Sequence, residues 1–222
     1  MGRGAERPVE ADADTAGAKP RVAVIDYGIG NLRSAAKALA RVGADAFLTS
    51  DPDQVEHADG VVLPGVGAFG RAVDAMRSLG LTEAASRSIE AGKPFLGICV
   101  GMQLLFEKSE ESPGVRGLGV LSGEVVRLPA DVKVPQMQWN LLERVGEPGM
   151  LRGVPDPVWV YFVHSYVPDV EEGVVALCDY GIRFPAAVEV ENVWATQFHP
   201  EKSGRTGLEM LARFVRRCEE RP

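Results

Sequence analysis

The sequence predicts an α/β protein with a central, mostly parallel sheet and antiparallel additions in its C-terminal half. Up to about residue 108, short runs that are apolar throughout alternate with stretches of helical periodicity. Such alternation is typical of parallel strands that helices cover on both faces. Beyond that point, strand-like runs follow one another at the spacing of turns, which indicates antiparallel strands.

The elements of the first half follow from apolar runs and their boundaries. Short apolar or β-branched runs predict strands over 21–26, 44–50, 59–64 and 93–98. Helical spacing, ended in most cases by Gly, predicts helices over 31–43, 71–80, 81–92 and 100–109. A glycine-rich loop, PGVGAFG (64–70), joins the third strand to its helix.

Strand-like segments and a closing helix make up the second half. The segments are GVLSGEVVRL, NLLERV, PVWVYFVHSYV, VVALCDYG and FPAAVEVENVWATQF, and the helix is expected over 203–219. The sequence shows no internal repeat and no linker long enough to separate two domains. We therefore expect a single domain over 21–222.

Composition and charge exclude several classes of protein. The 222 residues include 24 Lys or Arg and 31 Asp or Glu, a net charge of −7, without the basic cluster that nucleic acid requires. The longest apolar run, 158–163, is far shorter than the roughly 20 residues of a membrane span. Residues 1–20 mix acidic and basic side chains without an apolar run. A disordered N-terminal tail is expected there rather than a secretory signal.

Cysteine usage favours a reducing compartment. Cys99, Cys178 and Cys218 are odd in number, far apart, and form no Cys-x-x-Cys pair. This pattern argues against a disulfide framework and against a zinc ribbon. We therefore expect a cytoplasmic protein without a metal or another cofactor.

The segment GICVGMQLLF (97–106) carries the strongest signal for chemistry. A buried strand leads to Cys99, a glycine stands two residues away on each side, and a helix begins at once. In a nucleophile elbow this layout lifts the central side chain above the sheet, at a helix N-terminus that favours a thiolate. The backbone N–H of Val100 would then face a developing oxyanion. The alternative is that Cys99 is a small buried hydrophobe, the role expected here for Cys178 and Cys218.

A thiolate nucleophile needs a base, and the sequence has three histidines. His57 lies in a polar stretch and is expected at the surface, whereas His164 lies inside a strand, where a hydrogen-bonded core residue is the usual case. His199 ends an apolar strand, and Pro200 keeps its backbone extended. Residues two apart then face the same side, so Glu201 can orient the imidazole, as in a Cys-His-acid triad. The alternative is a loop histidine capped by its neighbour.

The glycine loop at 64–70 has three possible roles. Gly65, Gly67 and Gly70 would permit close approach of the backbone to a ligand. A phosphate cradle is disfavoured because neither a Walker ending nor a dinucleotide fingerprint is present. A second oxyanion donor and a plain strand-to-helix turn remain open.

Together these segments resemble class I glutamine amidotransferases. GICVGMQ is similar to that family's nucleophile motif and QFHPE to its His-Glu motif. A narrower resemblance, to the glutaminase subunits of imidazole glycerol phosphate synthase, rests on DYGIGNLRS (26–34), LPGVGAFG (63–70), PQMQWN (135–140), YFVHSY (161–166) and QFHPEKSG (197–204). It extends from about residue 21 to the end of the chain. The departures from the usual pattern are Val100 (often Leu), Gln136 (His), Gln138 (Gly) and Ala195 (commonly Gly).

The resemblance implies a three-layer, flavodoxin-like fold that hydrolyses glutamine through a cysteine thioester. It implies Cys99 as nucleophile, His199 as proton carrier and Glu201 as the carboxylate that orients it. The backbone of Val100, Val66 and Gly67 would form the oxyanion hole. The donor from the loop would face the oxyanion after a peptide flip. The expected lining of the glutamine pocket is Gly65, Gln103, His164, Ser165 and Tyr166. Tyr161 and Lys202 are expected near a partner interface.

The resemblance also implies a partner, a (β/α)8-barrel cyclase subunit. In that family ammonia passes through the barrel to a phosphoribulosyl formimino-carboxamide nucleotide, giving imidazole glycerol phosphate and an aminoimidazole carboxamide ribotide for histidine biosynthesis. Glutaminase activity there is weak until the cyclase binds its ligand, an allosteric coupling.

Three rival functions fit the sequence less well. DYGIGNL and YFVHSY disfavour another amidotransferase, such as an anthranilate or pyridoxal phosphate synthase glutaminase. The presence of Cys99, His199 and Glu201 together disfavours a non-catalytic regulatory subunit. A cysteine protease is the weakest rival, because nothing in the sequence suggests an extended peptide groove.

Overall fold

The structure is a computed structural model, and it describes residues 18–30 and 32–220. The predicted tail therefore lies outside the described residues up to residue 17, as do residues 31, 221 and 222. At residue 20 the chain is already part of the fold, because the carbonyl of Pro20 accepts a hydrogen bond of 2.9 Å from the backbone N–H of Asp45.

The main sheet has eight strands in the order β2-β1-β3-β4-β13-β12-β11-β8. Five of them are parallel neighbours: β2 (Asp45–Thr49), β1 (Arg21–Ile25), β3 (Gly60–Gly65), β4 (Phe95–Cys99) and β13 (Val193–Thr196). The other three extend the sheet in antiparallel fashion: β12 (Arg183–Val190), β11 (Val174–Asp179) and β8 (Glu143–Arg144). The predicted mostly parallel sheet with antiparallel additions is confirmed.

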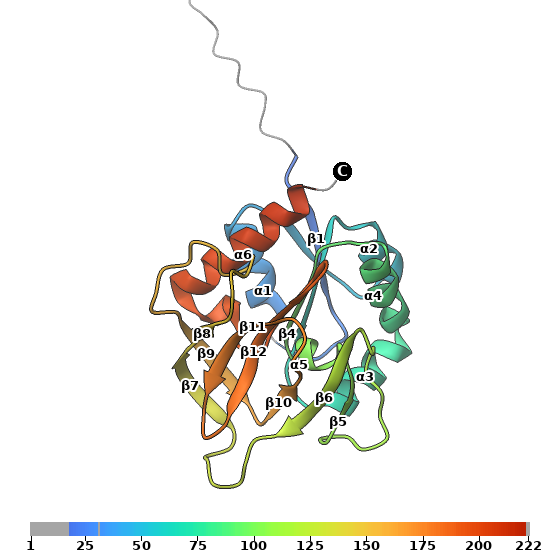
Figure 1. The fold of residues 1–222 in the computed structure, drawn as a ribbon. Coiled ribbons are helices and arrows are strands. Elements are labelled where there is room, and N and C mark those ends of the chain that lie inside the picture. Colours follow the sequence, from blue (N-terminus) through green and yellow to red (C-terminus); the bar gives the residue numbers. More distant parts are fainter. Residues whose placement is uncertain (1–17, 31, 221–222) are drawn as a thin grey trace, which may run out of the picture.

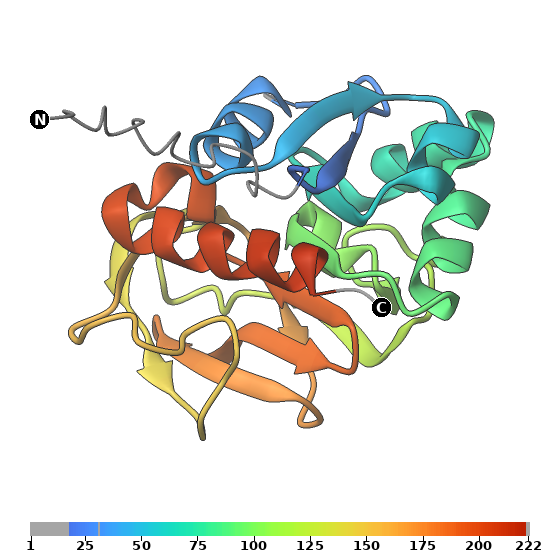
Figure 2. The same ribbon diagram turned by 90° about the horizontal axis from the view of Figure 1, so that it is seen from above.

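Helices cover both faces of this sheet and complete the predicted three layers (Figures 1 and 2). One face carries α1 (Leu32–Arg41) and α6 (Gly204–Glu219), which pack against each other. The opposite face carries α2 (Pro52–His57), α3 (Phe69–Ser78) and α4 (Leu81–Glu90). Strands β3 and β4 lie between these layers and are buried along their whole length, which explains why they are apolar throughout.

Two small sheets lie beside the carboxyl ends of the parallel strands. The first contains β10 (Tyr166–Asp169), β6 (Leu121–Arg127) and β5 (Phe106–Ser109). The second is an antiparallel pair, β7 (Gln136–Leu141) and β9 (Trp159–His164). Two short helices, α5 (Val100–Gln103) and η1 (Pro200–Lys202), directly follow the ends of β4 and β13.

Two predictions about elements were wrong. The helix expected over 100–109 stops at Gln103, because Phe106 pairs with Leu121 in β5 and β6 and this tertiary pairing outweighs the helical pattern. Conversely, the polar stretch after residue 50 contains α2. The Asp51 side chain caps this helix by accepting a 3.0 Å hydrogen bond from the N–H of Asp53, but its one buried residue, Val55, leaves no apolar stripe to detect. His57 is exposed there, as predicted.

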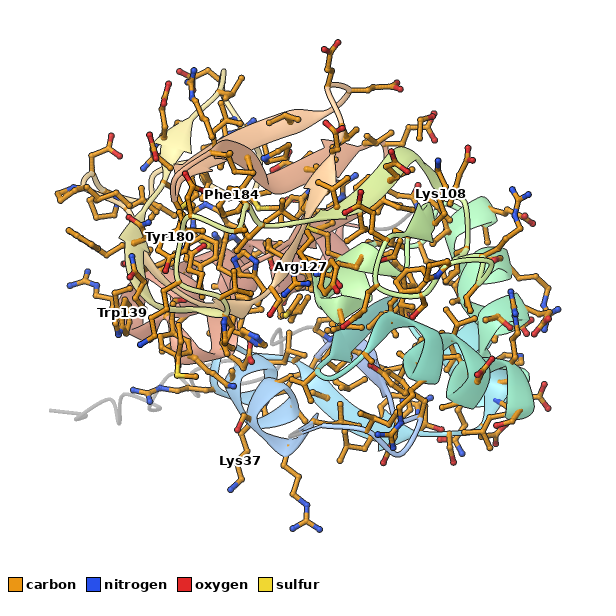
Figure 3. The ribbon with its side chains drawn as sticks, turned by 90° about the horizontal axis from the view of Figure 1, so that it is seen from below. Lys37, Lys108, Arg127, Trp139, Tyr180 and Phe184 are labelled. Atoms are coloured by element: carbon orange, nitrogen blue, oxygen red, sulfur yellow. The ribbon has the colours of Figure 1, made fainter. Side chains whose placement is uncertain are left out.

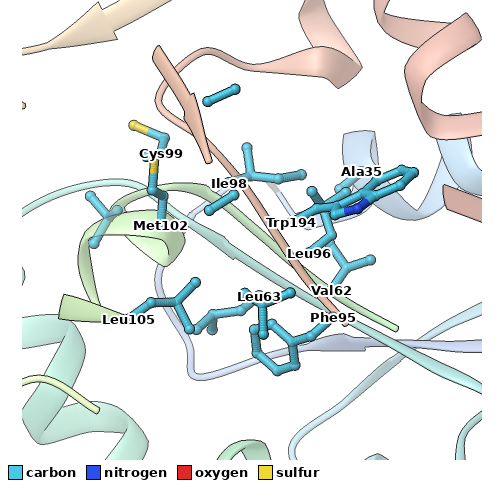
Figure 4. Close-up of a cluster of buried hydrophobic side chains, with 14 of the residues drawn as sticks. Ala35, Val62, Leu63, Phe95, Leu96, Ile98, Cys99, Met102, Leu105 and Trp194 are labelled. Atoms are coloured by element: carbon cyan, nitrogen blue, oxygen red, sulfur yellow. The ribbon is translucent and has the colours of Figure 1, made fainter. Parts of the chain in front are cut away.

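The turn between β4 and α5 is held by unusually close packing of three glycines. A Cβ on Gly101 would lie 1.7 Å from the carbonyl oxygen of Leu63, and one on Gly65 would lie 2.8 Å from the N–H nitrogen of Gly101. A Cβ on Gly97 would lie 2.9 Å from the carbonyl oxygen of Gly101. Figure 4 shows Cys99 at one end of the buried apolar cluster that this turn borders, with Trp194 on the far side. These positions therefore accept no larger residue.

We expect Gly101→Ala to destabilise the fold by about 3 kcal/mol or more, because the added methyl group must displace the backbone of β3. A matched control is Gly92→Ala, where no atom lies within 4 Å of the added Cβ and the cost is the strain of a φ of +72°, about 1–2 kcal/mol. Urea denaturation of both variants measures the difference. Equal losses would contradict the close approach of β3 to the turn.

Candidate active site

Cys99 occupies a strained turn at the carboxyl end of β4. Its backbone angles are φ 56° and ψ −111°, outside the regions that non-glycine residues usually adopt. The side chain is buried, and its S–H points toward the carbonyl oxygen of Val163 at 3.8 Å. The predicted strand, turn and helix are present in this order. Because α5 has four residues, its helix dipole contributes less than the sequence pattern suggested.

His199 follows β13, the strand beside β4, and is held on both sides. Its backbone N–H donates to the carbonyl of Tyr161 at 3.0 Å, and its own carbonyl accepts a 2.6 Å hydrogen bond from the Ser203 hydroxyl. Its Nδ1 lies 2.8 Å from Oε1 of Glu201, and both side chains are more than 90% buried. Since a carboxylate accepts hydrogen bonds, Nδ1 carries a proton, and the buried Nε2 has no hydrogen-bond partner in the described part of the chain.

The charges around His199 keep its imidazole protonated. Burial opposes the charged form, but the adjacent Cys99 sulfur, and after it Glu201, raise the pKa of His199 to about 10. The effect of the Cys99 sulfur on this pKa indicates that the imidazole lies close to the sulfur. This arrangement brings a buried imidazolium close to the cysteine sulfur, which the separation of the two motifs in the sequence could not establish.

His164 lies nearby in the opposite protonation state. Burial, and to a smaller extent the positive charge of His199, lowers the pKa of His164 to about 4, although the hydrogen bond to Tyr166 acts in the opposite direction. Its Nδ1–H donates to the carbonyl of Tyr166 at 3.0 Å, and its ring packs against Phe162 and Phe184. His164 is therefore neutral at pH 7, and its buried Nε2 has no hydrogen-bond partner in the described part of the chain.

A cavity of about 380 Å³ opens directly above Cys99. Nine residues of the sequence prediction line it: Val66, Gly67, Cys99, Val100, Gln103, His164, Ser165, Tyr166 and Lys202. The remaining lining consists of Glu111, Pro135 and Val163. Gly65, His199 and Glu201 border a smaller adjoining space of about 20 Å³. Tyr161 lines neither space, and its ring packs edge-on against Trp139 at 6.1 Å.

Two residues in contact with the candidate site were not predicted from the sequence. Gln197 is fully buried, and its Nε2 donates toward the Cys99 sulfur at 3.7 Å, while its Oε1 accepts a 3.1 Å hydrogen bond from Gln103. Its position two residues before His199, directly after β13, was an available signal. Glu111 reaches the cavity from the loop after β5 and accepts a 2.7 Å hydrogen bond from the N–H of Phe69. No local pattern marked it.

Gln136 and Gln138, the positions where the sequence departs from the resembled pattern, lie in different surroundings. Gln136 is fully buried, pairs opposite His164 in the β7–β9 ladder, and directs its Nε2 toward the sulfur of Cys178 at 3.9 Å. Gln138 is exposed. A change at Gln136 therefore concerns the packing behind the cavity, whereas Gln138 faces solvent.

Metal-binding clusters and membrane-spanning helices are both absent from the described ranges. These ranges contain no group of three or more His, Cys, Asp or Glu side chains arranged to hold a metal ion. They also contain no helix that is long and apolar enough to cross a membrane.

Comparison with known proteins establishes the family. The family model for class-I glutamine amidotransferases matches residues 23–218, so the chain belongs to this family. It is 52% identical over 195 residues to the imidazole glycerol phosphate synthase subunit HisH of Methanothermobacter thermautotrophicus, covering 87% of this chain and 97% of that protein. Identity to the subunit HisH of Aquifex aeolicus is 51% over 203 residues, covering 90% and 98%.

Solved structures confirm the fold. A crystal structure of a glutamine amidotransferase superposes with a TM-score of 0.71 at 24% identity, covering 89% of this chain and 98% of that chain. The structure of PurLQS from Thermotoga maritima gives 0.70 at 21% identity, covering 90% and 98%. The three-layer amidotransferase fold expected from the motifs is therefore confirmed.

The Glu201→Gln substitution tests the charge arrangement. Removing the negative charge of Glu201 removes one cause of the raised pKa of His199, so its imidazole should lose its proton at a lower pH than in the unmodified protein, where the midpoint is about 10. Titration of the imidazole nitrogens by NMR measures both midpoints. An unchanged His199 midpoint would show that Glu201 does not hold its proton.

Proposed function

We propose that this chain is the glutaminase subunit of an imidazole glycerol phosphate synthase, acting in the cytoplasm in histidine biosynthesis. The observation that carries the proposal is Cys99 on its strained turn close to the buried imidazolium of His199, with Glu201 hydrogen-bonded to that imidazole. The identity of about 50% to HisH subunits over nearly the full length of those relatives supports the choice within the family.

The reaction follows from this pair. The Cys99 thiolate attacks the side-chain amide carbon of glutamine, and the carbonyl oxygen takes up negative charge. His199 gives its Nε2 proton to the amide nitrogen and the C–N bond breaks. Ammonia departs, and a γ-glutamyl thioester remains on Cys99. Water then attacks the thioester, His199 accepts a proton from it, and glutamate departs as the thiolate is restored.

The groups around the cavity suit glutamine. The Glu111 carboxylate and the Lys202 ammonium, both at the lining, match the charged amino and carboxylate groups of a free amino acid. The backbone of Val100 is assigned to the oxyanion, with a second donor from Val66 and Gly67. Gly67 has a φ of +92°. Because glycine adopts such angles without strain, the peptide of this loop can reorient when the partner binds.

An exposed apolar surface beside the cavity supports a protein partner. Strands β7 and β9 place Met137, Trp139, Leu141, Trp159 and Tyr161 on one face, which we call the β7–β9 face. Met137 is 62% and Trp139 47% exposed, and Figure 3 shows Trp139 at the edge of the molecule. Large exposed apolar side chains that cluster in this way mark an interaction surface.

The position of this face suits the transfer of ammonia. The carbonyl of Val163, the β9 residue that pairs with Met137, lies 3.8 Å from the Cys99 sulfur. Ammonia released at the sulfur thus emerges beside the β7–β9 face. In bulk water near neutral pH it would become ammonium, which is not a nucleophile, so a cyclase docked over this face would receive it in the reactive form.

Cys99→Ala separates a catalyst from a regulatory subunit. We expect glutamine-dependent formation of imidazole glycerol phosphate to fall by more than about a thousandfold, since no nucleophile remains. Cyclase activity with added ammonium salt should be unchanged. Turnover with each nitrogen source, measured in the reconstituted complex, provides the readout. If the glutamine-dependent rate survives, Cys99 is not the nucleophile.

Trp139→Ala tests the docking face. We expect affinity for a barrel cyclase subunit to fall by about thirtyfold or more, because a large central aromatic side chain would lose its contacts. Leu79→Ala is the control, since Leu79 is 42% exposed in a different element, at the end of α3. Titration calorimetry gives both affinities. The face is wrongly assigned if the two substitutions have the same small effect.

A further inference from the structure

A second cavity lies between α6 and the loop that joins β8 to β9. It has a volume of about 360 Å³, within the range of small-molecule sites. Its walls include four arginines and one tryptophan: Arg152, Trp194, Arg213, Arg216 and Arg217. The loop runs beside α6 in both ribbon views (Figures 1 and 2), and a Cβ on its Gly153 would lie 2.9 Å from a guanidinium nitrogen of Arg213.

The positive charge in this cavity is not neutralised by ion pairs. Within the described part of the chain, none of the four guanidinium groups lies within ion-pair distance of a carboxylate, and the cavity lining contains one acidic residue, Glu220. Burial lowers the pKa of Arg213, and repulsion from Arg216 and Arg152 contributes in the same direction. A chain with a net charge of −7 therefore gathers like charges at one place, at a cost in free energy.

Packing holds part of this cluster in place. The Arg217 guanidinium lies over the Trp194 ring at 5.2 Å and donates to the carbonyl of Glu191. Arg213 donates to the carbonyl of Glu209 at 3.2 Å. Arg152 and Arg216, at the mouth, are exposed. Two guanidinium groups are thus preorganised at the walls while two can close over a ligand.

Trp194 adds a second, independent feature. It is 4% exposed, and its indole N–H is a buried donor without an acceptor among the residues that the structure describes. A buried donor left without a partner is costly, and Trp194 is one of the residues that line the cavity. Trp194 is the second residue of β13 and pairs with Leu96, whereas His199 follows the other end of that strand. The cavity is therefore separate from the one above Cys99.

We propose that the cavity lined by Arg152, Trp194, Arg213, Arg216 and Arg217 binds a small molecule that carries phosphate groups. Guanidinium groups bind phosphate oxygens through paired, charge-assisted hydrogen bonds, and an indole N–H is a donor of matching polarity. The described lining of the cavity contains no cluster of metal-ligating side chains, which disfavours a cation. The Trp194 ring is already covered by Arg217, which disfavours a stacked nucleobase, so an anion fits best.

Titration calorimetry of the full chain with inorganic pyrophosphate tests this proposal at constant ionic strength. We expect saturable binding with one site per chain. The double variant Arg152→Gln, Arg216→Gln should weaken it by about tenfold or more, since two charge-assisted contacts are lost. The control Arg33→Gln, Lys37→Gln removes the same charge from exposed positions on α1, away from the cavity, and its affinity should stay within about twofold of the unmodified chain.

A further variant addresses the indole. Trp194→Phe keeps an aromatic ring but removes the N–H donor, and its affinity should fall while its thermal unfolding in the absence of pyrophosphate stays cooperative. The proposal is overturned if pyrophosphate shows no saturable binding, or if both double variants weaken it equally. It is also overturned if alkylation of Cys99 abolishes binding, since the anion would then occupy the cavity above Cys99.

Discussion

The close approach of three backbone segments at the end of β4 is the constraint on which the site depends. Gly65, Gly97 and Gly101 let β3, β4 and the first turn of α5 meet at distances that a Cβ would forbid. This packing holds Cys99 at a φ of 56°, which its own side chain disfavours, and keeps the sulfur at the rim of the sheet. The burial of the apolar strands β3 and β4 offsets the free-energy cost of this backbone strain.

Two imidazoles near the sulfur differ because their partners differ. His199 has a carboxylate on one side and the sulfur on the other, so its positive charge is stabilised in a buried position. His164 has a carbonyl and two aromatic rings, and burial keeps it neutral. Environments that separate the pKa values of two like groups allow one of them to carry protons while the other provides a neutral wall.

The two surface features that the catalytic site does not use lie on different parts of the fold. The β7–β9 face is apolar and begins next to the sulfur, which suits a partner that must receive a product directly. The arginine-lined cavity lies at the start of β13, beneath the C-terminal half of α6, and its charge suits a small anion. Strand β13 connects both regions, because it carries Trp194 near one end and leads to His199 at the other.

The amino-acid sequence by itself determined the parallel sheet, the order of most elements, and the candidate nucleophile, base and carboxylate, because these leave local signals in apolar runs, glycines and Pro200. The helix predicted after Cys99 was too long, because the pairing of Phe106 with Leu121 that ends it is a long-range contact. Glu111 and the arginine cluster could not be found from local patterns, since their members come from segments far apart in the chain. Tertiary packing decides which of these side chains lie close together, and burial decides the charge that each of them carries.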